Sequence, residues 1–106
     1  EGQLVYGSSE VSAQLQRAHQ IPLCYVDTTG EATTSWPHNP NGSKGGAGAL
    51  CDPSGRLFGL MPHPEAFLYA ENHPRWRSRR DAGDDRAWGE GVSLLANGVK
   101  AALSAR

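Results

Sequence analysis

A four-residue turn signal constrains the folding of this chain more strongly than any other short segment. Asp52-Pro53-Ser54-Gly55 separates two apolar runs, Ala47 to Cys51 and Leu57 to Met61. Asp at the first position, Pro at the second and Gly at the fourth are preferred residues of a type I turn. The pattern predicts a β-hairpin whose second strand leads directly into the string Met61-Pro62-His63-Pro64-Glu65.

Hydrophobic periodicity predicts an α/β fold around this hairpin. Residues 9–20 show helical spacing, with N-cap hydroxyls in Gly7-Ser8-Ser9 before them and Pro22 expected to stop the helix. Strands are expected at Leu4 to Tyr6 and at residues 21–26, the second of them buried on both faces. A C-terminal amphipathic helix is also predicted, and its apolar face should pack on a sheet. The residues of that face recur at steps of four, three, four and four: Trp88, Val92, Leu95, Val99 and Leu103.

Composition and charge exclude several partner classes. The 106 residues include ten basic and eleven acidic side chains, and a net charge of −1 offers no attraction for nucleic acid or an anionic membrane. No apolar run approaches the roughly 18 residues of a membrane-spanning helix, and the first residues do not form a signal peptide. We therefore expect a soluble, cytoplasmic protein with no nucleic-acid or membrane partner.

Two segments carry few apolar side chains. Residues 27–48 form a long polar stretch with Trp36 as the only large apolar side chain, which favours a functional loop or an extended hairpin. Residues 75–86 mix arginines with aspartates, a composition typical of a solvated and mobile loop. The alternative for this region, taken as residues 72–86, is a docking surface for a partner domain.

The string around His63 holds two groups that could cooperate chemically. In an extended segment, residues i and i+2 face the same side, and the flanking prolines stiffen the backbone. His63 and Glu65 would then supply the base and the orienting carboxylate of a catalytic triad, with the two side chains about 2.6 to 3.2 Å apart. The alternative is a surface turn in which His63 ends a strand and Glu65 begins a helix after Pro64.

Three segments carry a resemblance to a known family. They are Tyr25-Val26-Asp27 with Gly30-Glu31, Asn39 to Ser43 leading to Gly46-Ala47-Gly48, and Gly59 to Glu65. In this order they resemble the C-terminal part of the glutaminase domain of phosphoribosylformylglycinamidine synthase, a class I glutamine amidotransferase. The resemblance implies a flavodoxin-like α/β sandwich, to which this chain contributes the later strands, the β-hairpin and the packed C-terminal helix.

The same resemblance implies a chemistry and a set of partners. In this family a cysteine thiolate attacks the side-chain amide of glutamine, and the released ammonia passes to an ATP-dependent synthetase domain or subunit in purine biosynthesis. His63 would act as base and acid and Glu65 as the orienting carboxylate, while Asn41, Gly42 and Ser43 would form a loop beside the substrate. The resemblance implies no cofactor or metal for this chain, and it places ATP and magnesium in the synthetase part.

The chain departs from the family pattern at the nucleophile. It contains no G-x-C-x-G elbow, and Cys24 and Cys51, which lie in apolar stretches without flanking glycines, are expected to be buried thiols. We therefore expect residues 1–106 to be the C-terminal part of one amidotransferase domain, with the nucleophile in an upstream segment, and to be inactive alone. A smaller departure is Ala66, where many members of the family carry arginine.

Two other functions stay open. One is a non-catalytic interaction module with the same scaffold that docks on a synthetase partner through residues 72–86. The other is a different γ-glutamyl hydrolase of the same superfamily. The loop Asn41-Gly42-Ser43 favours the synthase over that hydrolase.

Overall fold

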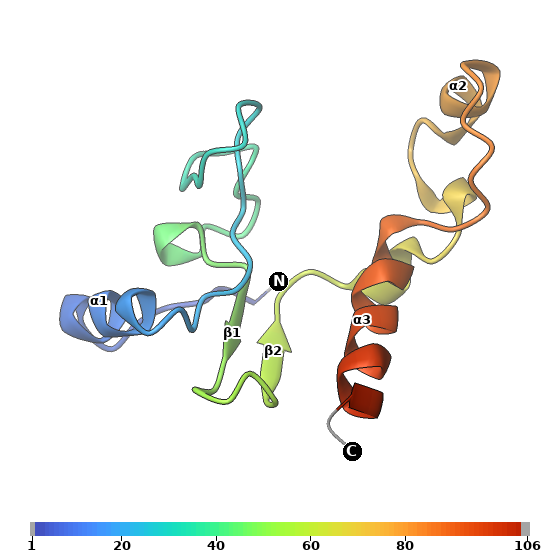
Figure 1. The fold of residues 1–106 in the computed structure, drawn as a ribbon. Helices are drawn as coiled ribbons and strands as arrows, with labels where there is room; N and C mark the ends of the chain where they lie inside the picture. Colours follow the sequence, from blue (N-terminus) through green and yellow to red (C-terminus); the bar gives the residue numbers. More distant parts are fainter. Residues whose placement is uncertain (1, 105–106) are drawn as a thin grey trace. The chain divides into compact units, whose positions relative to one another are not determined.

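The computed structural model describes residues 2–104 and divides the chain between Pro62 and His63 into two units. The elements of unit 1 are α1 (Ser9–Arg17), the 3₁₀ turn η1 (Lys44–Gly46), β1 (Ala49–Cys51) and β2 (Phe58–Leu60). The elements of unit 2 are η2 (Pro64–Phe67), η3 (Ala70–Asn72), α2 (Trp76–Asp81) and α3 (Glu90–Ser104). Figure 1 shows the two strands in the first unit and helical segments in the second. A small sheet combined with helices agrees with the predicted α/β class, and each unit is described by itself.

The predicted hairpin is confirmed. β1 and β2 pair antiparallel, with Leu50 opposite Gly59. The turn closes through the N–H of Gly55, which has φ 70° and donates to the Asp52 carbonyl at 3.0 Å. The Asp52 carboxylate also accepts a hydrogen bond from Ser54 Oγ at 2.6 Å. Local turn chemistry therefore decides where the two strands meet.

The core of unit 1 lies along β1 and the residues just before it. Ala47 and Ala49 have no exposed surface. The backbone of Gly48 forms hydrogen bonds on both sides, because its N–H donates to the Leu23 carbonyl at 2.8 Å and its carbonyl accepts the N–H of Met61 at 2.9 Å. Only small residues line this stretch, so two neighbouring segments can approach it closely.

The prediction of a fully buried strand at residues 21–26 was wrong. The segment forms only isolated bridges, Cys24 with Ala47 and Val26 with Ala32, and the side chains of Cys24 and Val26 are exposed. Burial of a strand on both faces requires covering elements on each side. The described part of unit 1 has one helix of nine residues, which is too little to cover both faces.

The strand predicted at Leu4 to Tyr6 was also wrong. Leu4 bonds instead to the polar loop, with its N–H donating to Ser43 Oγ at 3.0 Å and its carbonyl accepting the N–H of Lys44 at 3.1 Å. These two hydrogen bonds at Leu4 hold residues 4–6 against the loop, but they do not pair the segment with a strand. A side chain far along the sequence therefore determines the path of this segment.

Helix α1 begins as predicted and ends earlier. Ser8 is the N-cap, and its Oγ accepts a backbone N–H of the first turn at 3.2 Å. The helix ends before Pro22 is reached, because His19 adopts a left-handed φ of 54° and the N–H of Gln20 donates to the Leu15 carbonyl at 2.9 Å. The N–H of His19 also donates to the Gln16 carbonyl at 3.1 Å. The two bonds form a Schellman motif, with histidine at the position that glycine usually takes.

Helix α3 confirms the predicted C-terminal helix from Glu90 onward, but the placement of Trp88 on its apolar face was wrong. Trp88 precedes it and stacks on Tyr69, with ring centroids 5.6 Å apart, where the two residues form an isolated bridge. Within unit 2 the helix packs against η2, and Leu95 and Val99 are exposed. Packing of this face on a sheet stays a prediction. Neither α3 nor any other helix within residues 2–104 is long and apolar enough to cross a membrane.

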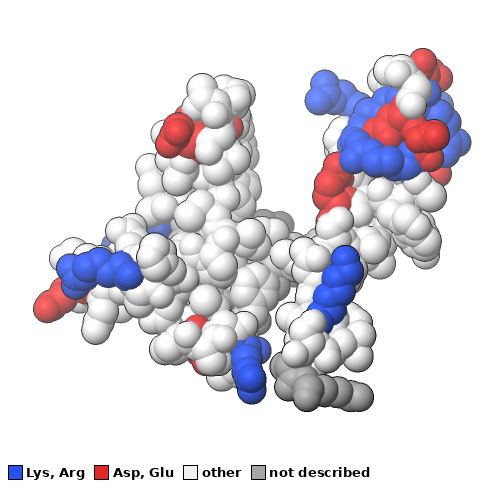
Figure 2. Space-filling model, viewed as in Figure 1, with Lys and Arg blue, Asp and Glu red and all other residues white. Residues whose placement is uncertain are grey.

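The mobile loop predicted for residues 75–86 is replaced in part by a helix. α2 occupies the first half of the segment, and Figure 2 shows basic and acidic side chains gathered over it. Arg80 pairs with Glu71 at 3.1 Å, and Arg79 pairs with Asp84 at 2.9 Å. Opposite charges lie close enough along this segment to pair with one another, which favours an ordered turn of helix over a solvated chain.

Candidate functional site

The two predicted catalytic side chains lie at the start of unit 2. His63 has extended backbone angles, φ −105° and ψ 91°, and is the N-cap of η2, whose first residue is Pro64. Glu65 lies in the first turn of η2, and both side chains are exposed. The prediction that the backbone stays extended through Glu65 was wrong, because proline suits the first position of a helical turn. The hydrogen bonds of residues 2–104 do not include one between the His63 imidazole and the Glu65 carboxylate, so the predicted distance is not met in this structure.

The turn that carries Glu65 is anchored at both ends within unit 2. The N–H of Ala66 donates to the His63 carbonyl at 3.0 Å and closes the turn. The N–H of Gly89 donates to the Leu68 carbonyl at 2.9 Å and ties the end of η2 to the start of α3. The backbone position of Glu65 therefore depends on how α3 packs.

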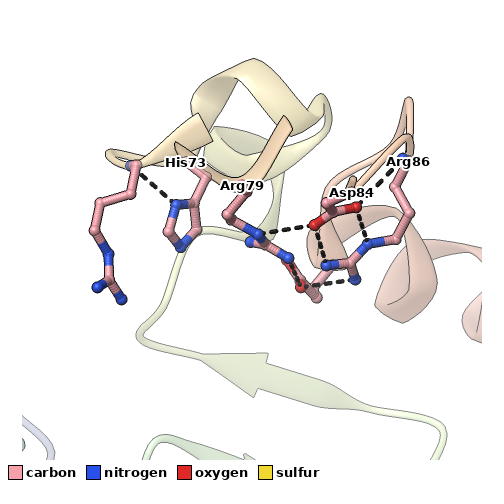
Figure 3. Close-up of polar contacts among 6 residues, drawn as sticks. His73, Arg79, Asp84 and Arg86 are labelled. Atoms are coloured by element: carbon pink, nitrogen blue, oxygen red, sulfur yellow. Dashed lines mark hydrogen bonds and ion pairs between the residues drawn. The ribbon is translucent and has the colours of Figure 1, made fainter. Parts of the chain in front are cut away.

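The segment after η2 carries a network of ion pairs, drawn in Figure 3. Asp84 accepts hydrogen bonds from Arg79 Nε at 2.9 Å and from Arg86 Nε at 2.8 Å. Glu90 lies 3.3 Å from Arg86 and 3.6 Å from Arg79. His73 Nδ1 accepts the backbone N–H two residues further along the chain at 3.0 Å. These charges are paired with each other, and docking of a partner on residues 72–86 stays a prediction.

The loop Asn41-Gly42-Ser43 is held by buried polar groups. Ser43 has no exposed surface, and its Oγ accepts the N–H of Leu4 at 3.0 Å. Asn39 is only 2% exposed, and its Nδ2 donates to the carbonyls of Ser43 at 2.9 Å and Thr33 at 3.3 Å. Buried polar groups are costly unless they are hydrogen-bonded, so these contacts fix the conformation of the loop.

Asn41 and Gly42 form the accessible part of this loop. Asn41 is half-buried, with Nδ2 donating to the Tyr25 hydroxyl at 3.1 Å and Oδ1 accepting the N–H of Ser43 at 3.0 Å. Gly42 is exposed with φ 71°, and its carbonyl accepts a hydrogen bond from Gln3 Nε2 at 2.6 Å. A ligand at this loop would therefore meet Asn41 and Gly42, while Ser43 supports them from inside.

Asn39 is the buried residue of this loop to which the sequence pattern assigned no role. Both of its Nδ2 hydrogens are used, while its Oδ1 is buried and has no hydrogen-bond partner among residues 2–104. The available sequence signal is its place before Pro40, since Asn before Pro favours a turn. That signal predicts a change of direction and says nothing about burial.

Neither cysteine has the setting of a catalytic nucleophile. Cys24 is exposed on an extended segment, and Cys51 is half-buried at the end of β1. The prediction of a buried thiol was wrong for Cys24, because no element in the described part of unit 1 covers it. Within residues 2–104, no three His, Cys, Asp or Glu side chains gather closely enough to hold a metal ion.

Comparison with known proteins shows the family of the chain. The family model described as a CobB/CobQ-like glutamine amidotransferase domain matches residues 1–100. The chain is similar to the phosphoribosylformylglycinamidine synthase subunit PurQ of Dehalococcoides mccartyi, with 37% identity over 100 residues. That alignment covers 94% of this chain and 36% of the bacterial subunit.

Two further relatives show the same pattern. The PurQ subunit of Methanococcus maripaludis is 36% identical over 77 residues, which cover 72% of this chain and 28% of that subunit. Human phosphoribosylformylglycinamidine synthase is 42% identical over 65 residues, which cover 61% of this chain and 5% of the human protein. The chain thus spans 36%, 28% and 5% of the lengths of these three curated relatives. Because the family model matches nearly all of the chain, including His63 and Glu65, the chain belongs to the CobB/CobQ-like glutamine amidotransferase family.

Proposed function

We propose that this chain is part of the glutaminase of a phosphoribosylformylglycinamidine synthase. The glutaminase hydrolyses glutamine and supplies ammonia for the synthesis of formylglycinamidine ribonucleotide in the cytoplasm. The observation that carries the proposal is the 37% identity to a PurQ subunit over 94% of the chain. In this proposal a synthetase domain or subunit receives the ammonia and uses ATP and magnesium.

His63 moves protons in the proposed reaction, and Glu65 orients it. A cysteine thiolate from outside residues 1–106 attacks the amide carbon of glutamine, and the imidazolium of His63 protonates the amide nitrogen, so that ammonia departs and a glutamyl thioester forms. The neutral imidazole then takes a proton from the water that hydrolyses the thioester. The exposure of His63 and Glu65 supports this assignment, since both can reach groups supplied by another part of the protein. Catalytic hydrogen bonds are often loose without substrate and tighten in the complex.

The accessible part of the polar loop in unit 1 is proposed to contact glutamine, as the family resemblance implies. Asn41 and Gly42 offer side-chain amide and backbone groups to glutamine, while buried Ser43 keeps them in place. The left-handed φ of Gly42, 71°, favours glycine at this point and supports a tightly turned loop.

A flavodoxin-like sandwich is proposed for the complete domain. α3 leaves three apolar side chains exposed, Leu95, Val99 and Leu103, at 48%, 60% and 62% of their surface. A parallel sheet in this class of fold has both faces covered by helices, and it would offer the apolar surface that this helix face needs. The remaining strands would come from outside this chain.

The His63→Ala variant of the complete synthase tests the catalytic proposal. Loss of the base should lower glutamine-dependent synthesis by about 10²- to 10⁴-fold. Synthesis from added ammonia should be retained, because that reaction does not need the glutaminase. The His38→Ala variant removes another exposed histidine and should leave both rates unchanged.

The same pair of assays separates the alternatives. An unchanged glutamine-dependent rate in His63→Ala would refute the catalytic role and favour the non-catalytic docking module. Loss of both rates would mean that the substitution disrupts the assembly and not the glutaminase chemistry. A different γ-glutamyl hydrolase would show hydrolysis of γ-glutamyl substrates without any product from the synthetase.

A further inference from the structure

Gly89, directly before α3, and Gly91, in the first turn of α3, lie against η2. Gly91 is buried, and a Cβ at this position would lie 2.7 Å from the Phe67 carbonyl oxygen and 2.8 Å from the Pro64 carbonyl carbon. The Pro64 carbonyl oxygen would be closer still. A Cβ at Gly89 would lie 2.7 Å from Cε2 of the Phe67 ring and closer to the Phe67 carbonyl oxygen.

The crowding at Gly91 cannot be relieved by a rotating side chain. Its nearest neighbours are backbone atoms of η2, and Pro64 has a ring that holds its φ near one value. Any added Cβ must therefore push α3 and η2 apart. η2 contains Glu65 and begins directly after His63, so such a movement displaces the proposed catalytic pair.

A third glycine in the same helix shows that this crowding is specific. A Cβ at Gly98 would have no atom within 4 Å. Glycine destabilises a helix interior relative to alanine, so each glycine in α3 has an intrinsic cost. At Gly91 the missing side chain allows close contact with the backbone of η2, whereas at Gly98 a side chain would meet no neighbouring atom.

We propose that Gly91, together with Gly89, is a positioning residue for His63 and Glu65. The absence of a side chain lets the first turn of α3 seat against the backbone of η2 and hold the proposed base and carboxylate in their working places. The inference rests on the proposed glutaminase function, because it concerns how the same two side chains are placed. Gly91 itself touches neither glutamine nor the reacting atoms.

The Gly91→Ala variant of the complete synthase tests this inference through kinetics. Displacement of a catalytic group by about 1 Å can cost about 10²-fold, so the glutaminase kcat should fall by about 10- to 100-fold. KM for glutamine should change by less than about threefold, because the loop around Asn41 lies outside η2 and is unaltered. The pH profile of kcat should also shift, since the surroundings of His63 change. Ammonia-dependent synthesis should be retained.

Hydrogen exchange supplies a readout that does not depend on glutaminase activity. The N–H of Ala66 donates a hydrogen bond to the His63 carbonyl. Its exchange with solvent deuterium should accelerate in Gly91→Ala. Exchange should be unchanged in Gly98→Ala, the matched control on the same helix. If His63→Ala keeps glutaminase activity, the proposed function fails, while this exchange measurement still reports whether Gly91 positions η2.

Two outcomes would overturn the inference. One is an unchanged kcat and pH profile in Gly91→Ala although exchange at Ala66 accelerates. The other is an equal loss of kcat in Leu94→Ala, which removes a half-buried side chain from α3 without crowding η2 and reports general destabilisation. If Gly91→Ala protein does not fold, Gly89→Ala is measured in its place, since the three atoms nearest to its Cβ all belong to Phe67. A wild-type kcat in Gly89→Ala would then refute the positioning role.

Discussion

Removal of the Ser43 hydroxyl should loosen the attachment of the N-terminal segment to the polar loop. Ser43 is completely buried, and its Oγ accepts the N–H of Leu4 at 3.0 Å across 39 residues of sequence. The Ser43→Ala variant leaves that N–H without its acceptor, and a buried unsatisfied donor costs about 1–3 kcal/mol. Leu4 is half-buried, so water can partly replace the hydroxyl, and we expect about 1–2 kcal/mol.

Hydrogen exchange at Leu4 in the complete protein measures this loss directly. About 1.4 kcal/mol corresponds to a factor of ten, so exchange should accelerate about 5- to 30-fold. The Ser35→Ala variant is the matched control, because Ser35 is exposed in the same polar segment and its Oγ forms no hydrogen bond within residues 2–104. Unchanged exchange at Leu4 together with a raised KM for glutamine would refute the reasoning, since the hydroxyl would then serve the substrate.

Two further perturbations act on charged groups. Asp52 has its pKa lowered to about 2, chiefly by the hydroxyl of Ser54. A carboxylate with a lowered pKa stabilises the folded state at pH values above its pKa in the unfolded chain, which is near about 4. The denaturant midpoint of wild type should therefore exceed that of Asp52→Ala at neutral pH, and the difference between the two midpoints should close as pH falls toward 2. A difference that does not depend on pH would contradict this. Asp84→Ala breaks the partly exposed pair with Arg79 and should speed amide exchange in α2 by an amount equivalent to at most about 1 kcal/mol. The effect should shrink near 1 M salt, where the screening length is about 3 Å, and Asp85→Ala should lack it.

Predictions that depended on neighbouring residues were confirmed. The hairpin turn involves Asp52, Ser54 and Gly55, whose contacts span no more than a few residues. The N-cap of α1 needs only the Ser8 hydroxyl and an N–H in the next turn. Such interactions form whenever the local residues are present, so a sequence pattern is enough to predict them.

Predictions about burial and about the ends of elements failed where a distant segment decides. Leu4 forms no strand because Ser43 takes its N–H, and Cys24 is exposed because the described part of unit 1 does not cover it. α1 stops at a left-handed His19, which no local pattern specifies. These outcomes depend on which groups meet in three dimensions and on how much apolar surface is available to cover a segment.

The candidate site shows the same division. His63 and Glu65 were proposed as base and orienting carboxylate from their types and spacing together with the resemblance to a known family, and this assignment stays a prediction. The helical turn that begins at Pro64 was predictable, because proline favours the first position of a helix. From the sequence, this turn was treated as the alternative, and an extended backbone was preferred. The crowding at Gly91 was not predictable, because it requires α3 to pack on η2.

The sequence by itself therefore determined the hairpin, the α/β class and the C-terminal helix, and it supplied His63 and Glu65 as the residues of the candidate site. Each of these depends on turn preferences, hydrophobic periodicity or residue type, which are local properties. Only the tertiary structure decided that Ser43 and Asn39 are buried supports and that Gly91 lies against the backbone of η2. The hydrogen bond between Leu4 and Ser43 and the packing of Gly91 on η2 join residues far apart in the chain. The bonds of Asn39 to Thr33 and Ser43 span at most six residues, and they form only once the loop has folded around that side chain.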